Sequence, residues 1–381
     1  MQYRTFGKTG LEVSTLGFGL MRLPLAGPES GDIDEDRAID LVRYAIDNGV
    51  TFLDTAHGYH GGQSEHLAAR VLKDGYREKV TLMTKLPSYL VEEEADFERL
   101  LTEQMEKLET DYIDVYLLHA LNRERWDIVQ PLGVTDFLDR AIADGRIGAA
   151  GFSFHDDLSV FKEIVDAHHW DACLIQLNFM DWDYQAGVEG MRYANDKGMG
   201  VAVMEPLRGG KLAGRIPAQV EEIWSRKNPD WSPAEWAFRW VANHPEVGVI
   251  LSGMGNMDEL RENISILSDA KPDSLTEEEL QLIEEVRSVY LERMAVGCTE
   301  CGYCVPCPEG VGIPNIFKLY NDASMYDDVD NASRMYGNML RDGKGFPSCV
   351  DCGVCIEACP QGIDIPRVLA QADDSLAEDE E

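Results

Sequence analysis

Short apolar runs alternate with longer amphipathic stretches along the first 270 residues of the chain. Eight of these runs have the length and residue types of buried strands, and they occupy residues 16–19, 51–54, 80–84, 113–118, 147–151, 174–177, 201–204 and 247–251. Between them, apolar residues recur every three or four positions, most clearly in 36–48 and 95–108, as on one face of a helix. The pattern therefore predicts eight strand–helix units.

Eight such units in about 250 residues are typical of an α/β protein with a (β/α)8 TIM barrel. A doubly wound open sheet is the competing architecture, and it usually has a glycine-rich turn after its first strand. Here the first strand ends in Gly17-Phe-Gly19 without a third glycine, so the barrel is preferred. We expect a hairpin of residues 3–5 and 12–14 to close the bottom of the barrel, a last helix over 276–293, and a barrel domain spanning 1–290.

Eight of the nine cysteines fall in two runs near the C-terminus. The second run has the C-x2-C-x2-C-x3-C-P spacing of bacterial iron–sulfur sites, and the first run is one residue shorter before its last cysteine. Two intervening residues let successive thiolates face one centre, and the proline then turns the chain away. The runs therefore predict iron–sulfur ligands, with structural zinc as the alternative, at Cys298, Cys301, Cys304, Cys307, Cys349, Cys352, Cys355 and Cys359.

The two runs are copies of one another, because 304–314 echoes 355–366. Such duplication resembles two-cluster ferredoxins, in which the last cysteine of each run ligates the other cluster. We expect two [4Fe–4S] clusters, with one cluster on the second run as the alternative. Helical patterns at 315–321 and 332–340 indicate a small, mainly helical ferredoxin-like domain over 295–372, followed by an acidic tail at 373–381.

The charge of the chain narrows the choice of partners. Asp and Glu number 69 against 34 Lys and Arg, a net charge of −35, which argues against binding nucleic acid or an anionic membrane. No apolar stretch approaches the length of a membrane span. The first residues lack the apolar core of a signal peptide, so we expect a cytoplasmic protein whose clustered cysteines bind metal and form no disulfides.

Polar residues follow three neighbouring strands of the predicted barrel. Asp54 and Tyr59 follow the second strand, Lys85 the third and His119 the fourth, at the carboxyl ends where barrel active sites form. A lysine ammonium would lower the pKa of a tyrosine, which is ordinarily near 10, and a carboxylate would hold that lysine in place. With a histidine to hydrogen-bond the substrate oxygen, the set predicts a general acid for carbonyl reduction or a base for alcohol oxidation.

These motifs resemble the aldo-keto reductase family over roughly residues 1–290. They are Asp54-Thr-Ala-x-x-Tyr59, Leu82-Met-Thr-Lys85, Asp114 to His119, Gly151-Phe-Ser153, Gln176-Leu-Asn178 and Pro206-Leu-x-x-Gly210. The cysteine-rich part resembles the ferredoxin-like extension of one branch of that family. The resemblance implies Tyr59 as acid/base, Lys85 and Asp54 tuning it, His119 orienting a small carbonyl or alcohol, and NAD(P)H bound at Ser153, Gln176, Leu207, Gly209, Gly253, Gly255 and Asn263.

Three positions depart from the pattern of the family. Phe154 replaces an asparagine, Met204 replaces the aromatic residue that stacks on nicotinamide, and Glu259 stands about where an arginine is expected. Backbone donors at Gly253 and Gly255, before a helix, can still hold a pyrophosphate. We therefore expect no strong NADP preference. The alternative function is an electron-transfer or redox-sensing iron–sulfur protein on a barrel with weakened nicotinamide use, and a redox partner protein would then dock on it.

Overall fold

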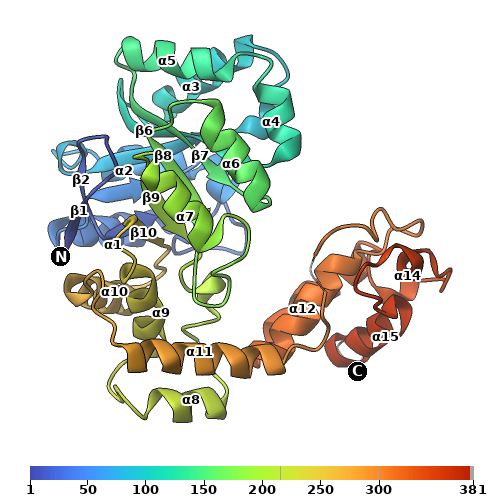
Figure 1. The fold of residues 1–381 in the computed structure, drawn as a ribbon. Helices are drawn as coiled ribbons and strands as arrows, with labels where there is room; N and C mark the ends of the chain where they lie inside the picture. The colour runs from blue at the N-terminus through green and yellow to red at the C-terminus, as the bar shows by residue number, and fades with distance from the viewer. Residues whose placement is uncertain (215, 299, 378–381) are drawn as a thin grey trace. The chain divides into compact units, whose positions relative to one another are not determined.

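The computed structural model describes residues 1–214, 216–298 and 300–377 and divides into two compact units (Figure 1). The first unit comprises 1–209 and 235–276, and the second comprises 210–234 and the chain from 277 onward. None of the helices within the described ranges has both the length and the apolar character needed to span a bilayer. The sequence placed the boundary near 290, whereas packing places residues 210–234 and the last predicted helix with the cysteine-rich part.

Eight parallel strands close into a barrel in the first unit, as the hydrophobic pattern predicts, and this closure rules out the open sheet. Neighbours follow chain order, and the last strand pairs with the first. Two strands run about three residues beyond the predicted apolar runs, through the residues that carry the candidate site. The strands are β3 (Leu16–Gly19), β4 (Phe52–Asp54), β5 (Thr81–Leu86), β6 (Ile113–Leu121), β7 (Ile147–Phe154), β8 (Ala172–Gln176), β9 (Gly200–Met204) and β10 (Val247–Ser252).

The N-terminal hairpin packs into the barrel interior, as predicted. Its strands are β1 (Tyr3–Thr5) and β2 (Glu12–Ser14), paired antiparallel with Tyr3 opposite Ser14. Phe6 and Val13 are fully buried in the cluster that fills the barrel. The ring of Phe6 lies 5.6 Å from that of Phe52, edge to face, so the hairpin seals one end of the core.

Amphipathic helices connect the strands. The first begins after Asp34, whose side chain accepts a hydrogen bond from the amide of Arg37, and ends at the cap Asn48-Gly49, with Gly49 at φ 94°. The helices of this unit and its border are α1 (Glu35–Asp47), α2 (Ser64–Val71), α3 (Ala95–Lys107), α4 (Arg123–Val129), α5 (Val134–Ala143), α6 (Leu158–Ala167), α7 (Gly187–Asp196), α9 (Pro233–Ala242) and α10 (Met257–Asp269), with 3-10 turns η1 (Tyr59–Gly62), η2 (Arg77–Lys79), η3 (Ser88–Leu90) and η4 (Arg208–Gly210).

The second unit is helical, with its own core of buried aliphatic and aromatic side chains. The two helices between the cysteine runs are longer than predicted. At the end predicted for the first of them, polar residues are bonded within the unit: Asn321 binds the backbone of Val296, and Asp322 pairs with Lys211. The helices are α8 (Ala218–Trp224), α11 (Glu277–Glu292), α12 (Ile313–Tyr326), α13 (Val329–Arg341), α14 (Val354–Ala358) and α15 (Ile365–Leu376), with the 3-10 turn η5 (Phe346–Ser348).

The predicted acidic tail is shorter in the structure. Helix α15 continues to Leu376, which is buried, and Asp373 accepts a hydrogen bond from the hydroxyl of Tyr336. Residues 373–376 therefore belong to the packed unit, and the remaining acidic residues at 378–381 lie outside the described part.

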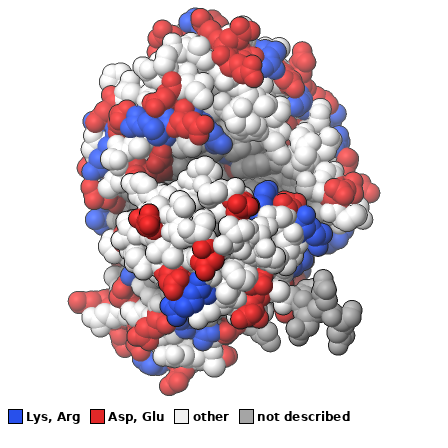
Figure 2. All heavy atoms as spheres, turned by 90° about the vertical axis from the view of Figure 1, so that its right-hand side faces the viewer, with Lys and Arg blue, Asp and Glu red and all other residues white. Residues whose placement is uncertain are grey.

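The acidic surface expected from the composition is visible in Figure 2. Acidic side chains lie on all sides of this face, and Lys and Arg are scattered among them instead of forming one basic patch. Many cations of the chain have an acidic partner: the ammonium of Lys79 lies 3.0 Å from the carboxylate of Asp47, and the guanidinium of Arg43 lies 3.1 Å from that of Asp74.

Candidate active site and iron–sulfur sites

The four predicted catalytic residues lie on three adjacent strand ends of the barrel. Asp54 ends β4, Lys85 lies on β5 and His119 on β6, while Tyr59 begins the turn η1 after β4. Because β4 pairs with β5 and β5 with β6, the structure brings all four into one arc.

Lys85 connects this set. Its ammonium lies 2.5 Å from a carboxylate oxygen of Asp54, 2.9 Å from the carbonyl of Thr55 and 3.2 Å from the hydroxyl of Tyr59. Burial alone would lower the pKa of Lys85, but Asp54 and the tyrosine oxygen together raise it above its ordinary value. Burial raises the pKa of Asp54, and the ammonium opposes that shift. Lys85 is therefore held as a cation beside the phenol.

The pKa of Tyr59 moves opposite to the direction expected from the sequence. Burial raises it, and the Lys85 ammonium lowers it by less than burial raises it. The sequence revealed the lysine but not how completely the phenol is removed from water. Tyr59 consequently remains protonated at neutral pH and can give up a proton, and the ammonium at 3.2 Å can stabilise the phenolate that results.

His119 faces Tyr59 and stays neutral. The two rings lie 6.0 Å apart, edge to face. Burial, and next the charge of Lys85, lower the pKa of His119 to about 3. Its Nδ1 is buried, and within the described residues it has no hydrogen-bond partner. A neutral imidazole with an unused nitrogen suits hydrogen bonding to a substrate oxygen.

A bulge in β6 directs His119. The register between β6 and β7 shifts between Leu118 and Leu121, and Ala120 takes a left-handed conformation with φ 54°. The Ala120 amide donates to the hydroxyl of Ser153 at 2.6 Å. Ser153, predicted to contact the cofactor, is thus 1% exposed, and its hydroxyl oxygen is already bonded to this bulge.

The predicted cofactor residues lie at or just after the ends of β7 to β10, opposite the catalytic arc, except Asn263, which lies in α10. Gln176 ends β8, and its amide donates to a carboxylate oxygen of Asp181 at 3.0 Å. The same oxygen lies 3.4 Å from the guanidinium of Arg208. Leu207 and Gly209 follow β9 in and beside the turn η4. Asp181 is a residue of this region that the sequence motifs did not reveal, because it lies in a loop without repeat or spacing.

After β10, both predicted glycines have close neighbours. Gly253 lies against the side chain of Arg22, where an added Cβ would come within 2.9 Å of the arginine Cβ. The amide of Gly255 donates to the carboxylate of Glu259 at 2.9 Å. Asn263 is buried and donates to the hydroxyl of Ser252 at 3.1 Å. The structure therefore places Arg22 beside the glycines, although it comes more than 200 residues earlier in the sequence.

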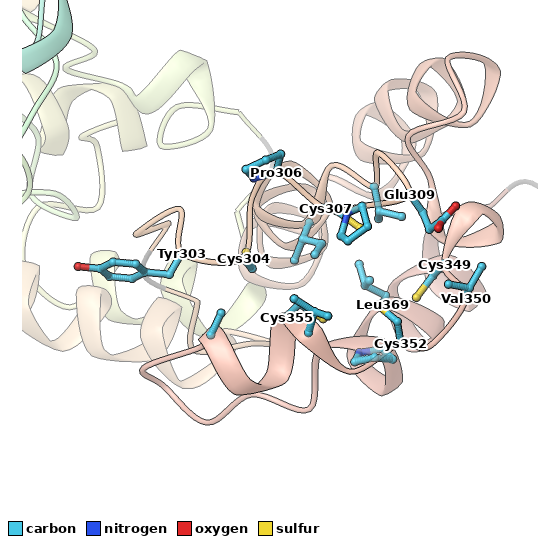
Figure 3. A pocket seen from close by; sticks show the side chains of 16 residues that line it. Tyr303, Cys304, Pro306, Cys307, Glu309, Cys349, Val350, Cys352, Cys355 and Leu369 are labelled. Carbon is cyan, nitrogen blue, oxygen red and sulfur yellow. The ribbon is translucent and has the colours of Figure 1, made fainter.

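Two hollows in the second unit are lined by cysteines from both runs. Each takes three cysteines of one run and the last cysteine of the other, which is the exchange that two-cluster ferredoxins show. The first hollow is lined by Cys298, Cys301, Cys304 and Cys359. The second hollow is lined by Cys307, Cys349, Cys352 and Cys355, and Cys304 borders it as well (Figure 3).

The sulfurs surround these hollows instead of meeting at a point. In the ranges the structure describes, no three Cys, His, Asp or Glu side chains converge closely enough for a single ion. Four thiolates around an open volume are the donor set for a polyatomic cluster, whose iron atoms each take one thiolate. The two cysteine runs also contain the same turn. Gly302 and Gly353 have φ values of 77° and 76°, and the carbonyl of each accepts a hydrogen bond from the amide three residues further along the chain. The residues present fit iron–sulfur clusters.

Comparisons with known proteins agree with both parts of the site. The model of the aldo/keto reductase family matches residues 15–288, and that of the 4Fe-4S dicluster domain matches residues 297–363. The chain is 26% identical over 297 residues to probable aldo-keto reductase 1 of Glycine max, covering 69% of this chain and 83% of that protein. It is 25% identical to the NADH-specific methylglyoxal reductase of Escherichia coli, covering 69% and 92%.

A solved structure shares the barrel. The aldo-keto reductase AKR11C1 from Bacillus halodurans, in its holo form, matches with a TM-score of 0.63 and 25% identity over 75% of this chain and 96% of that one. The family match covers most of the chain, and the barrel and the dicluster domain each have a counterpart. The chain is thus an oxidoreductase that belongs to the aldo-keto reductase family and carries a C-terminal 4Fe-4S dicluster domain.

Proposed function

We propose that the chain reduces a small carbonyl compound with NADH and that Tyr59 donates the proton. The observation that carries this proposal is the position of the Lys85 ammonium, in hydrogen-bond reach of both Asp54 and Tyr59 inside a buried site. A buried charge is expensive unless it is paired. An electron-transfer protein has no evident use for a cation held against a phenol, whereas proton donation to a carbonyl uses every member of the set.

Each residue then has one task. The nicotinamide, when bound, supplies the hydride that the carbonyl carbon receives. Tyr59 passes its hydroxyl proton to the carbonyl oxygen, and Lys85 stabilises the phenolate left behind. Asp54 keeps Lys85 charged, and the neutral ring of His119 hydrogen-bonds the oxygen. The product is the alcohol, and Tyr59 regains its proton from solvent.

The preference for NADH follows from the end of β10. Glu259 accepts a hydrogen bond from the Gly255 amide, and Asp258 precedes it in the first turn of α10. The 2′-phosphate of NADPH would meet the carboxylates of Asp258 and Glu259 at this turn, whereas the 2′-hydroxyl of NADH could donate a hydrogen bond to one of them. The E. coli relative is named for NADH specificity, which supports the same choice. Arg22, beside Gly253, is the cation best placed to face a pyrophosphate.

Activity of protein purified without oxygen tests this function. We expect aldehyde-dependent oxidation of NADH, faster than that of NADPH, and a loss of roughly 10²- to 10⁴-fold in kcat for Tyr59→Phe. Tyr112→Phe removes a half-exposed hydroxyl at the start of β6 and serves as the matched control. Full activity in Tyr59→Phe, or no turnover of any carbonyl by the unmodified protein, would contradict the proposal.

We further propose that each hollow binds one [4Fe–4S] cluster, which when bound can accept or release one electron. The four-cysteine lining of both hollows supports two clusters over one. Eight iron atoms per chain are then expected. Cys359→Ser should remove the cluster in the hollow that Cys298, Cys301 and Cys304 also line, and leave the second cluster, as seen in iron content and paramagnetic resonance. Four iron atoms in the unmodified protein would support the single-cluster alternative.

A further inference from the structure

An arginine beside the catalytic arc has no acidic partner among the residues that the structure describes. Arg125, in α4, is half-buried and donates to the carbonyl of Ala120 at 2.5 Å. Arg123, two residues earlier, instead binds both carboxylate oxygens of Glu163, at 2.5 and 2.7 Å. Across the described residues no carboxylate lies within ion-pair distance of Arg125. In a chain with twice as many acidic as basic residues, such isolation needs a reason.

Ring contacts connect Arg125 to the proton donor. Its guanidinium lies 5.9 Å from the ring centre of Tyr89, and that ring lies 6.1 Å from the imidazole of His119. His119 in turn lies 6.0 Å from Tyr59. The Coulomb effect of Arg125 reaches His119 and His155, whose pKa values are lowered first by burial. The two rings between Tyr59 and Arg125, those of His119 and Tyr89, thus carry no negative charge, and the Asp54 carboxylate of the site is already paired with Lys85.

The bulge of β6 fixes the guanidinium relative to His119. Ala120 directly follows His119, its amide is bonded to Ser153, and its carbonyl holds Arg125. Among the described residues, only one Nη of Arg125 donates a hydrogen bond, although a guanidinium has five N–H donors in a planar fork. That fork matches the two oxygens of a carboxylate better than any neutral group.

We infer that this site takes carbonyl compounds that also carry a carboxylate, and that Arg125 is the residue that binds the carboxylate. The inference rests on the proposed function, because it assigns the substrate class of the same site. The carbonyl lies between Tyr59 and His119, and the carboxylate extends past Tyr89 to the guanidinium. Arg125 thereby selects substrates, whereas the proton transfer stays with Tyr59.

A matched substrate pair tests this assignment. Succinic semialdehyde is compared with butanal at saturating NADH. In Arg125→Gln we expect kcat/KM for the carboxylate member to fall roughly 10- to 100-fold, mainly through KM, and that for the neutral member to change little. Arg125→Lys should restore part of the loss. Arg123→Gln, which removes a cation already paired with Glu163, should leave both values unchanged.

Each other outcome has a definite meaning. Equal losses for both members of a pair would show that Arg125 is structural, and faster reduction of glyceraldehyde 3-phosphate than of succinic semialdehyde would assign the site to phosphates; either result overturns the inference. If no carbonyl is reduced, the proposed function fails by itself. Calorimetric binding of succinate to the full chain still decides the role of Arg125: binding that Arg125→Gln abolishes supports it, and binding that survives overturns it.

Discussion

Replacing Lys85 with methionine tests the buried ion pair directly. The side chains of Lys85 and Asp54 are 1% and 5% exposed, and their charged atoms lie 2.5 Å apart. Methionine keeps the unbranched apolar stem of the lysine, so the variant mainly removes the charge. Asp54 is then a buried carboxylate without a cation, and breaking such a pair costs about 3–5 kcal/mol. That is a large part of the 5–15 kcal/mol of an ordinary domain.

The pH dependence of this loss has a defined sign. In the variant, burial raises the pKa of Asp54 without the opposition of Lys85. The folded state then binds more protons than the unfolded state, so the free energy of unfolding falls as pH rises. The destabilisation should be small below the unfolded-state pKa of about 4 and complete above the raised folded-state pKa.

Urea unfolding at pH 4 and pH 7, followed by near-ultraviolet circular dichroism, measures the effect. The double variant Asp54→Leu, Lys85→Met removes both charges and should recover most of the lost stability while remaining inactive. The single variant Asp54→Leu completes the cycle. Asp54 and Lys85 would not stabilise each other if Lys85→Met were as stable as the unmodified protein at pH 7, or if the double variant lost the sum of the two single changes.

Three further predictions concern separate parts of the chain. Burial and Lys85 lower the pKa of His119 to about 3, so kcat/KM should not change with an apparent pKa of about 6.5. A change of kcat/KM near that pH that His119→Gln abolishes would contradict this expectation. Glu259→Arg should raise the ratio of kcat/KM for NADPH over NADH by roughly tenfold or more, whereas Glu262→Arg, exposed on the same helix, should not. Burial raises the pKa of Cys173 to about 12, so iodoacetamide should leave this thiol unmodified in the folded protein. The Cys173→Ser protein should bind as much iron as the unmodified protein. Labelling of Cys173 would contradict the first expectation, and a loss of iron would contradict the second.

Much of the architecture could be predicted because it depends on local patterns. The apolar runs of the eight strands are buried within one barrel, and their period distinguishes them from the helices between them. The four catalytic candidates could be found for the same reason, since carboxyl ends of parallel strands meet at one face. The cysteine runs were readable because thiolate spacing reflects the cluster that they bind.

What the sequence did not reveal depends on distant contacts. The net pKa of Tyr59 requires knowing how deeply η1 is buried, which no local pattern gives. Tyr89 and Arg125 follow strands without motif or repeat, and only packing brings them to His119. A bulge is likewise defined by the pairing of two strands, so the shift between β6 and β7 has no signal in either strand alone.

That bulge supports a last prediction, on the strain at Ala120. Its φ of 54° costs a residue with a Cβ about 1–2 kcal/mol. Ala120→Gly removes that cost but also gives the unfolded chain more freedom, worth about 0.4–1 kcal/mol. The free energy of unfolding should therefore rise by about 1 kcal/mol or less. Ala120→Val puts a β-branched side chain in the same left-handed conformation, so the free energy of unfolding should fall, and by more than it rises in Ala120→Gly.

The functional consequence separates backbone from side chain. The bonds of Ala120 to Ser153 and Arg125 use its amide and carbonyl, which glycine retains. Ala120→Gly should therefore keep the preference for carboxylates, measured as the ratio of kcat/KM for succinic semialdehyde over butanal, while Ala120→Val reduces it. A glycine variant that is stable but has lost the ratio would show that the Cβ, and not the backbone, sets the distance between His119 and Arg125. If Ala120→Gly keeps the ratio, the backbone of the β6 bulge sets that distance, and with it the length of the substrate that fits between His119 and Arg125.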